Sequence, residues 1–208
     1  MLVLVGGHTR NIGKTSVAAG LIRTVPEGNW SAMKITQFGH GICSASGKAC
    51  GCCLAPDHLF DVTEEREPNN SDSGRFLEAG ARRSYWVRTA LGQLGAALPT
   101  IHKLFDQSSN FVVESNSLVE FLRPDLYLMV LDFEKEDFKA SSLRLLNRAD
   151  ACVVIQNTRS APTWENVPTD LWQGKPKFQV APPQYAAATL SAFVADRLTG
   201  AATRSSAR

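Results

Sequence analysis

Residues 7–15 read GHTRNIGKT, and this stretch decides the fold. It follows a short apolar run, Leu2 to Val5, and precedes a segment from Lys14 to Arg23 in which apolar residues recur at helical spacing. A glycine-rich turn between a strand and a helix is the setting of a phosphate-binding loop, where backbone N–H groups and the helix N-terminus surround an anion. The sequence therefore predicts a phosphate loop at this turn.

The residues of the predicted loop have distinct expected roles. Lys14 supplies a positive charge to the β- and γ-phosphates, and the Thr15 hydroxyl is a ligand for Mg²⁺, so we assign both to catalysis. The expected nucleotide contacts are Gly7, Thr9, Arg10, Asn11, Ile12, Gly13, Lys14, Thr15 and Ser16. The alternative is a glycine-rich turn that binds nothing, which the order of strand, Gly-Lys-Thr and helix disfavours.

Strands and helices alternate outward from the loop. Further strands are expected at Trp30–Thr36, Ser84–Arg88, Asn110–Val113, Leu126–Leu131, Ala151–Gln156 and Lys177–Val180. Helices are expected at Arg75–Ala81, Leu91–Phe105, Ala140–Arg148 and Ala186–Arg197. This alternation predicts an α/β fold, with a mostly parallel β-sheet and helices on both faces.

The predicted domain covers residues 1–198, followed by a tail at 199–208 that we expect to be disordered because it is rich in Ala, Ser and Arg. Residues 38–73 show no clear periodicity and are predicted to form a long Cys-rich excursion after the second strand.

The composition excludes several classes of protein. The chain has 208 residues, of which 44% are hydrophobic and 20% charged, with a net charge of +2. These values argue against a disordered chain, a coiled coil and a polybasic nucleic-acid binder. No apolar run approaches the ~20 residues of a membrane helix, and the first ten residues lack the basic region of a signal peptide. We expect a cytoplasmic protein with no nucleic-acid or membrane partner.

Four cysteines, Cys43, Cys50, Cys52 and Cys53, fall within eleven residues of the excursion. Clustered thiols in a reducing compartment are typical of a metal site, so zinc or an iron–sulfur cluster is a candidate cofactor. Their spacing matches neither a zinc ribbon nor a ferredoxin, and a site shared across a dimer is one way to complete the ligand set. The alternative is a group of reduced structural cysteines.

Two motifs carry a resemblance to known families. The G-x5-G-K-T spacing of residues 7–15 resembles dethiobiotin synthetase and the related cobyrinic acid synthases. The segment SDSGRFLEAGA, residues 71–81, resembles part of molybdopterin-guanine dinucleotide biosynthesis protein B. Both families belong to the SIMIBI class of P-loop NTPases, so the resemblance implies that fold, a homodimer, and ATP or GTP with Mg²⁺. The cysteine cluster matches neither family.

Carboxylates near the loop are candidate ligands for Mg²⁺. Glu114 ends the apolar run FVVE, and a strand-terminal acid at this sheet edge lies beside a phosphate loop. In the resembling synthetases the corresponding strand ends Val-Glu-Gly with the acid near the metal, which implies a catalytic Glu114. Asp132 ends the next strand and is the second choice.

The resembling segment implies a further Mg²⁺ ligand, Asp72, with Asp57 and Asp61 as alternatives. Arg75 in the same segment is expected to contact phosphate or substrate, the alternative being a solvated helix charge.

The resemblance also implies a place for the nucleobase. Asn157 follows the strand Ala151–Gln156 and is expected to bind the edge of the base, because its amide both donates and accepts hydrogen bonds. Pro182, after the last strand, is expected to flank the base. No N-K-x-D motif is present, so adenine is favoured over guanine, although a strand-terminal Asn is also an ordinary turn residue.

Three functions follow from these residues. The first is Mg²⁺-dependent hydrolysis of ATP or GTP, coupled to cofactor or metal-site biosynthesis. The second is an ATP-dependent ligase or kinase that activates a carboxylate of a small molecule, as in dethiobiotin synthetase. The third is a regulatory module that binds nucleotide without hydrolysing it.

Overall fold

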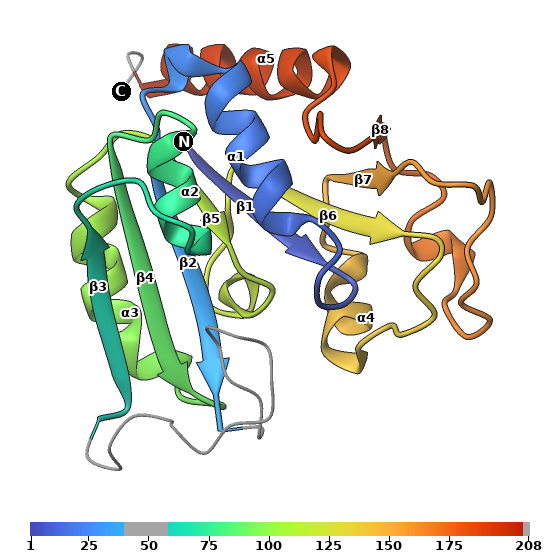
Figure 1. Cartoon of the computed structure of the whole chain (residues 1–208), viewed down its shortest axis with the longest axis horizontal. Coiled ribbons are helices and arrows are strands. Elements are labelled where there is room, and N and C mark those ends of the chain that lie inside the picture. Colours follow the sequence, from blue (N-terminus) through green and yellow to red (C-terminus); the bar gives the residue numbers. More distant parts are fainter. Residues whose placement is uncertain (40–57, 206–208) are drawn as a thin grey trace.

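A computed structural model describes residues 1–39 and 58–205 of the chain (Figure 1). The strands of the described part are β1 (Leu2–Gly7), β2 (Ser31–Phe38), β3 (Phe60–Glu65), β4 (Arg83–Ala90), β5 (Phe111–Glu114), β6 (Leu126–Asp132), β7 (Ala151–Ile155) and β8 (Lys177–Val180). The α-helices are α1 (Lys14–Thr24), α2 (Asp72–Glu78), α3 (Leu94–Phe105), α4 (Ala140–Leu146) and α5 (Ala188–Ser205). The Cys-rich stretch expected at 43–53 and the alternative ligand Asp57 lie outside the described residues.

The described strands form one eight-stranded sheet in the order β3-β4-β2-β5-β1-β6-β7-β8. Neighbouring strands run parallel from β4 to β8, whereas β3 runs antiparallel to β4. The predicted α/β class with a mostly parallel sheet is therefore confirmed.

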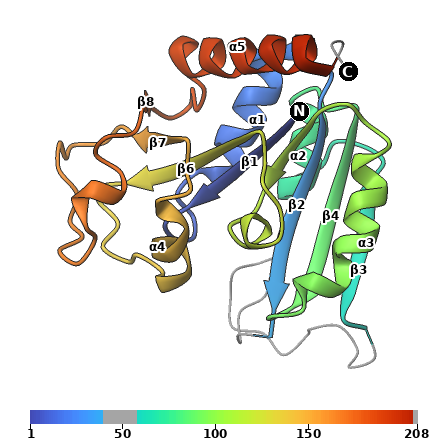
Figure 2. The same ribbon diagram turned by 180° about the vertical axis from the view of Figure 1, so that it is seen from behind.

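Helices cover both faces of this sheet (Figures 1 and 2). Helices α1, α2 and α5 contribute to one apolar core, and α3 and α4 contribute to the other. Successive residues of β1 point into alternate cores, Val3 and Val5 into the first and Leu4 into the second. Because both faces are buried, the central strands are continuous apolar runs, which is why the sequence revealed them.

Strand β1 lies between β5 and β6, which sets the position of the loop that follows it. In the parallel register Val5 lies opposite Glu114 of β5, and Gly7 lies opposite Val130 of β6. The carboxyl ends of these strands meet at one edge of the sheet, where ligands bind in open α/β folds.

Strand β3 was not predicted, because it falls within the stretch 38–73 that was expected to form a loop. Its sequence FDVTEE lacks an apolar run, since it is an edge strand paired on one side. Two ion pairs join it to β4, Arg88 to Asp61 at 2.6 Å and Arg83 to Glu64 at 2.7 Å. Cross-strand pairs of opposite charge therefore accompany the packing of Phe60 and Val62 against the core.

Several helix boundaries also differ from those expected, including the start of α2 and the end of α5. Helix α2 begins at Asp72, three residues before the predicted start at Arg75, because the Ser71 hydroxyl caps it by accepting a hydrogen bond from Gly74 N at 2.9 Å. Helix α5 runs to Ser205 rather than ending at Arg197, so it extends into the stretch 199–208 that was expected to be disordered. Among the described helices, none combines the length and the apolar character needed to cross a membrane.

The Ser71 cap gives a test of this part of the fold. We expect Ser71→Ala to lower the free energy of unfolding by about 1 kcal/mol, because Gly74 N loses its acceptor. Urea unfolding followed by circular dichroism measures the change, with Ser160→Ala at an exposed loop position as the control. Equal stability of the two variants would contradict the assignment of the cap.

Candidate phosphate-binding site

The turn between β1 and α1 has the backbone conformation of an anion-binding loop. Asn11 and Gly13 adopt left-handed conformations, with φ of 55° and 86°. Gly13 caps α1, and its carbonyl accepts a hydrogen bond from Val17 N at 2.8 Å. Left-handed residues among right-handed ones turn successive N–H groups toward one side, which forms a concave site for an anion beside the helix N-terminus.

Asn116 fixes the start of this loop, and the sequence analysis did not identify it. Its Oδ1 accepts a hydrogen bond from Gly7 N at 2.7 Å, and its Nδ2 donates to Gly7 O at 2.7 Å. A Cβ on Gly7 would lie 2.8 Å from side-chain atoms of both Ile12 and Lys14, so a larger residue there would displace these side chains. Its position just after the apolar strand β5 could have indicated Asn116 as a residue of the site.

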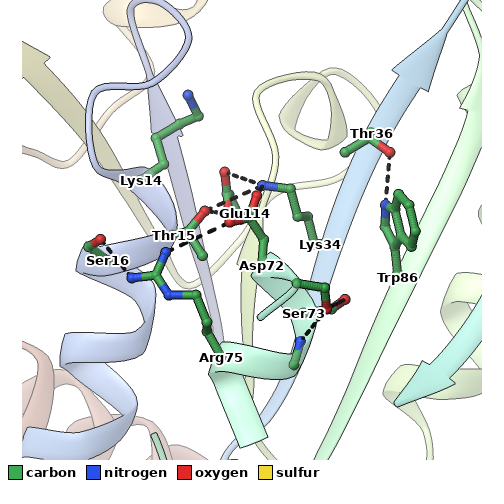
Figure 3. Close-up of polar contacts among 12 residues, drawn as sticks. Lys14, Thr15, Ser16, Lys34, Thr36, Asp72, Ser73, Arg75, Trp86 and Glu114 are labelled. Atoms are coloured by element: carbon green, nitrogen blue, oxygen red, sulfur yellow. Dashed lines mark hydrogen bonds and ion pairs between the residues drawn. The ribbon is translucent and has the colours of Figure 1, made fainter. Parts of the chain in front are cut away.

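Lys14 bends back over the loop. Its Nζ donates a hydrogen bond to Thr9 O at 2.7 Å, and Figure 3 shows the side chain pointing away from Glu114. Burial lowers the pKa of Lys14 to about 8, and the positive charges of Lys34 and Lys139 act in the same direction. The loop thus presents a partly desolvated ammonium group, which gains stability from any anion placed beside it.

Four side chains from four different elements meet beneath the loop (Figure 3). We call Thr15, Lys34, Asp72 and Glu114 the Lys34 cluster. The Thr15 hydroxyl donates to Glu114 Oε2 at 2.6 Å. Lys34 Nζ lies 2.6 Å from Asp72 Oδ2, 3.0 Å from Glu114 Oε1 and 3.3 Å from Thr15 Oγ1.

The charges within the Lys34 cluster stabilise one another. Burial by itself would lower the pKa of Lys34, but the carboxylates of Glu114 and Asp72 outweigh it, and the pKa is raised. The role of Lys34 was not predicted from the sequence. A lysine within the apolar strand Trp30–Thr36 could have indicated it, because a charged residue in a buried strand needs a partner.

The three side chains predicted from the sequence as Mg²⁺ ligands thus lie together. Thr15, Asp72 and Glu114 direct one hydroxyl and two carboxylates at the position of the Lys34 ammonium. Hard oxygen donors of this kind are the ligands that Mg²⁺ prefers. The donor set fits that ion.

A cavity of about 1040 Å³ extends over the loop and the Lys34 cluster. Its lining includes residues 9–16 of the loop and α1, residues 34–37 of β2, and residues 114–117 after β5. The first turn of α2 contributes Asp72 and Arg75, and the connection between β8 and α5 contributes Tyr185. We call this space the loop cavity.

A second cavity of about 790 Å³ lies along α1, between α2 and the start of α5. We call it the α1 cavity; it shares Ser16, Arg75 and Tyr185 with the loop cavity. Arg75 Nη2 donates to Ser16 Oγ at 3.0 Å, so this guanidinium lies where the two spaces adjoin (Figure 3). A Cβ on Gly13 would be 2.7 Å from the Tyr185 ring, which therefore packs directly on the phosphate loop.

Other candidates from the sequence lie apart from this site. Asn157 Nδ2 donates to Asp132 Oδ1 at 2.8 Å, and neither residue lines the two cavities, nor does Pro182. Asp61 pairs with Arg88 at the edge of the sheet. Cys43, Cys50, Cys52 and Cys53, the expected ligands of zinc or an iron–sulfur cluster, lie outside residues 1–39 and 58–205.

His8 joins the loop to the segment after β6 and was not predicted as functional. Its Nε2 accepts a hydrogen bond from Asp132 N at 3.1 Å, so Nδ1 carries the proton and donates to Asp137 O at 3.0 Å. Burial lowers the pKa of His8 to about 4. Both ring nitrogens are thus satisfied by the neutral form, and the Thr9 hydroxyl adds a hydrogen bond to Asp137.

Comparisons with known proteins agree with this geometry at the level of the fold. No family model and no curated protein matches the chain. HypB from Helicobacter pylori, solved in complex with nickel, is 12% identical over 95% of this chain and 87% of its own, with a TM-score of 0.51. The chain therefore shares the fold of HypB, an open and mostly parallel α/β sheet. LpxK from Aquifex aeolicus, solved in its apo form in complex with ATP, is 17% identical over 86% of this chain and 53% of its own, with a TM-score of 0.48.

The neutral His8 of this P-loop gives a pH-dependent prediction. The unfolded chain binds the histidine proton near pH 6.5, whereas the folded chain binds it near pH 4, so stability falls as the pH drops between these values. We expect the titration of His8 to lower the free energy of unfolding by about 2.5 kcal/mol when the pH falls from 7 to 4.5.

Urea unfolding at the two pH values checks the His8 prediction. His8→Asn is the reference, because it lacks the titrating group while other acidic residues still titrate. If the wild type and His8→Asn lose stability equally on acidification, the neutral bridging role of His8 is wrong.

Proposed function

We propose that this chain is a Mg²⁺-dependent P-loop NTPase of the SIMIBI class that binds ATP or GTP and transfers or hydrolyses the γ-phosphoryl group. The single observation that carries the proposal is the convergence of Thr15, Asp72 and Glu114 on one cation position beneath the loop. A phosphate loop alone binds an anion, whereas a loop with a cation site beneath it suits a nucleotide with its metal.

In this proposal the chain contributes mainly position and charge. Backbone N–H groups of residues 9–15 hold the phosphates, and Lys14 leaves Thr9 O to neutralise the β- and γ-phosphates. Thr15, Asp72 and Glu114 hold Mg²⁺, directly or through water, and that ion when bound supplies further neutralisation of phosphate charge. Glu114, which accepts the Thr15 hydrogen bond, orients this ligand and is placed to polarise an attacking group.

The α1 cavity is our proposed place for the nucleoside. It begins at Ser16, the last of the nucleotide contacts predicted in the loop, and Tyr185 is part of its lining. A planar base gains by stacking on an aromatic ring. We therefore propose Tyr185 and Arg75 as nucleoside contacts in place of Asn157 and Pro182, which do not line either cavity.

A second candidate function is phosphoryl transfer to the carboxylate of a small molecule. The observation that favours it is the extent of the loop cavity, which continues past the Lys34 cluster to Gln37, Phe121 and Arg144. Phe121 is an exposed apolar side chain, and the Arg144 guanidinium lies 3.9 Å from Glu120 with 66% of its side chain exposed. An acceptor with an apolar part and an anionic end would fit this end of the cavity.

Lys14 tests the proposed function directly. We expect Lys14→Ala to weaken binding of Mg·ATP and Mg·GTP roughly a hundredfold, since a charge-assisted contact to phosphate is lost. Isothermal titration calorimetry measures the affinities, and Lys103→Ala on the exposed side of α3 is the matched control. Unchanged nucleotide affinity in Lys14→Ala would refute the phosphate-loop assignment. Phosphate release by the wild type separates an NTPase from a module that binds without hydrolysis.

Tyr185 tests the place of the nucleoside. We expect Tyr185→Ala to weaken nucleotide binding about tenfold through the loss of stacking, and Tyr185→Phe to bind as the wild type does. Tripolyphosphate, which has no base, should bind the wild type and Tyr185→Ala equally. The assignment fails if Tyr185→Ala binds the nucleotide with wild-type affinity.

A further inference from the structure

Lys34 occupies the point on which the candidate Mg²⁺ ligands converge. Its ammonium contacts one oxygen from each of Asp72, Glu114 and Thr15, at 2.6, 3.0 and 3.3 Å. Lys34 and Glu114 are largely buried, with 13% and 6% of their side chains exposed, whereas Asp72 is 44% exposed. The cluster therefore has one open side, toward the loop cavity and solvent.

A lysine in this position competes with a divalent cation. Both require the same carboxylate lone pairs, and an ammonium group and a metal ion this close together repel each other in a partly buried site. Without Lys34, two carboxylates and a hydroxyl would face each other, with the Arg75 guanidinium, 3.8 Å from Asp72, as a more distant partner. With Lys34 in place, one of the two negative charges is already compensated, and the ammonium group contacts both carboxylates.

The Lys34 ammonium group also has a second position open to it, in the loop cavity. It lines the loop cavity together with Lys14, and its flexible four-carbon stem allows the ammonium group to move while the backbone stays in β2. The phosphates of a bound nucleotide would bring new negative charge to this cavity. An anion there would draw the ammonium group away from the carboxylates and leave their oxygens to the metal.

We propose that Lys34 is an internal cation that blocks the divalent-metal site, and that a nucleotide opens the site by pairing with Lys34. This inference rests on the proposed function, and it adds regulation of metal entry to it. Its consequence is positive coupling: the metal alone binds weakly, and nucleotide and metal each raise the affinity of the protein for the other.

The test is Mn²⁺ binding in the absence of nucleotide, measured from the electron paramagnetic resonance signal of the free ion. Mn²⁺ takes oxygen ligands as Mg²⁺ does and is directly visible. We compare the wild type with Lys34→Met, which removes the competing charge, and with Lys34→Arg, which keeps it. Lys139→Met removes a positive charge that lines the same cavity, and it measures the general effect of charge.

We expect Lys34→Met to bind Mn²⁺ about tenfold or more tightly than the wild type, because one nearby positive charge is gone. Lys34→Arg should remain at the wild-type level, and Lys139→Met should change much less. Adding Asp72→Asn to Lys34→Met should remove the gain, which locates the new site in the cluster. Equal or weaker Mn²⁺ binding by Lys34→Met overturns the proposal.

Loss of Lys34 removes the ammonium partner that Asp72 and Glu114 share, so Lys34→Met is expected to be less stable than the wild type. Lys34→Gln keeps hydrogen-bond donors near the carboxylates and serves as the second variant. For either variant, Mn²⁺ should raise the melting temperature by more than it does for the wild type, and an equal shift counts against the proposal. Nucleotide binding by the wild type is measured separately, so a protein that binds no nucleotide refutes the proposed function rather than the competition between Lys34 and the metal.

Discussion

The parallel pairing of β1 with both β5 and β6 is the constraint on which the site depends. It brings Gly7, at the end of β1, within reach of Asn116 after β5, and it sets Glu114 under the first turn of α1. From there Thr15 donates to Glu114, and Glu114 pairs with Lys34. A shift in this register would separate the loop from Glu114, because the loop follows β1 and Glu114 ends β5.

Charge organises the site into two regions on either side of Thr15. Lys14 lies over the loop, desolvated and bonded to a backbone carbonyl, and it needs an anion. Lys34 lies beneath it with two carboxylates, in a group that keeps one net negative charge. A nucleotide with its metal adds negative charge above and positive charge below. The folded chain thus presents a charge pattern that such a ligand would complement.

The sequence was most informative where local pattern and burial coincide. Buried parallel strands such as β6 are continuous apolar runs, and the loop from Gly7 to Thr15 has a spacing that local chemistry explains. Strand β3 escaped prediction because it has few apolar residues and its contacts with β4, two ion pairs among them, join residues distant in sequence.

The site was predictable only in part for the same reason. Thr15, Asp72 and Glu114 could be named, and they lie together, whereas Lys34, Asn116 and His8 act through contacts with residues distant in sequence. Asn157 was chosen by resemblance, and its amide is bonded to Asp132 instead of facing either cavity.

A crystal structure of the protein with Mg²⁺ and a non-hydrolysable ATP analogue would show directly where the nucleotide and the metal bind. We expect the triphosphate to lie within residues 7–15 and the metal to be held by Thr15, Asp72 and Glu114. We also expect the Lys34 ammonium group to have moved from the carboxylates to the phosphates. A nucleotide bound elsewhere, or a metal bound while Lys34 keeps both of its carboxylate contacts, would contradict these expectations.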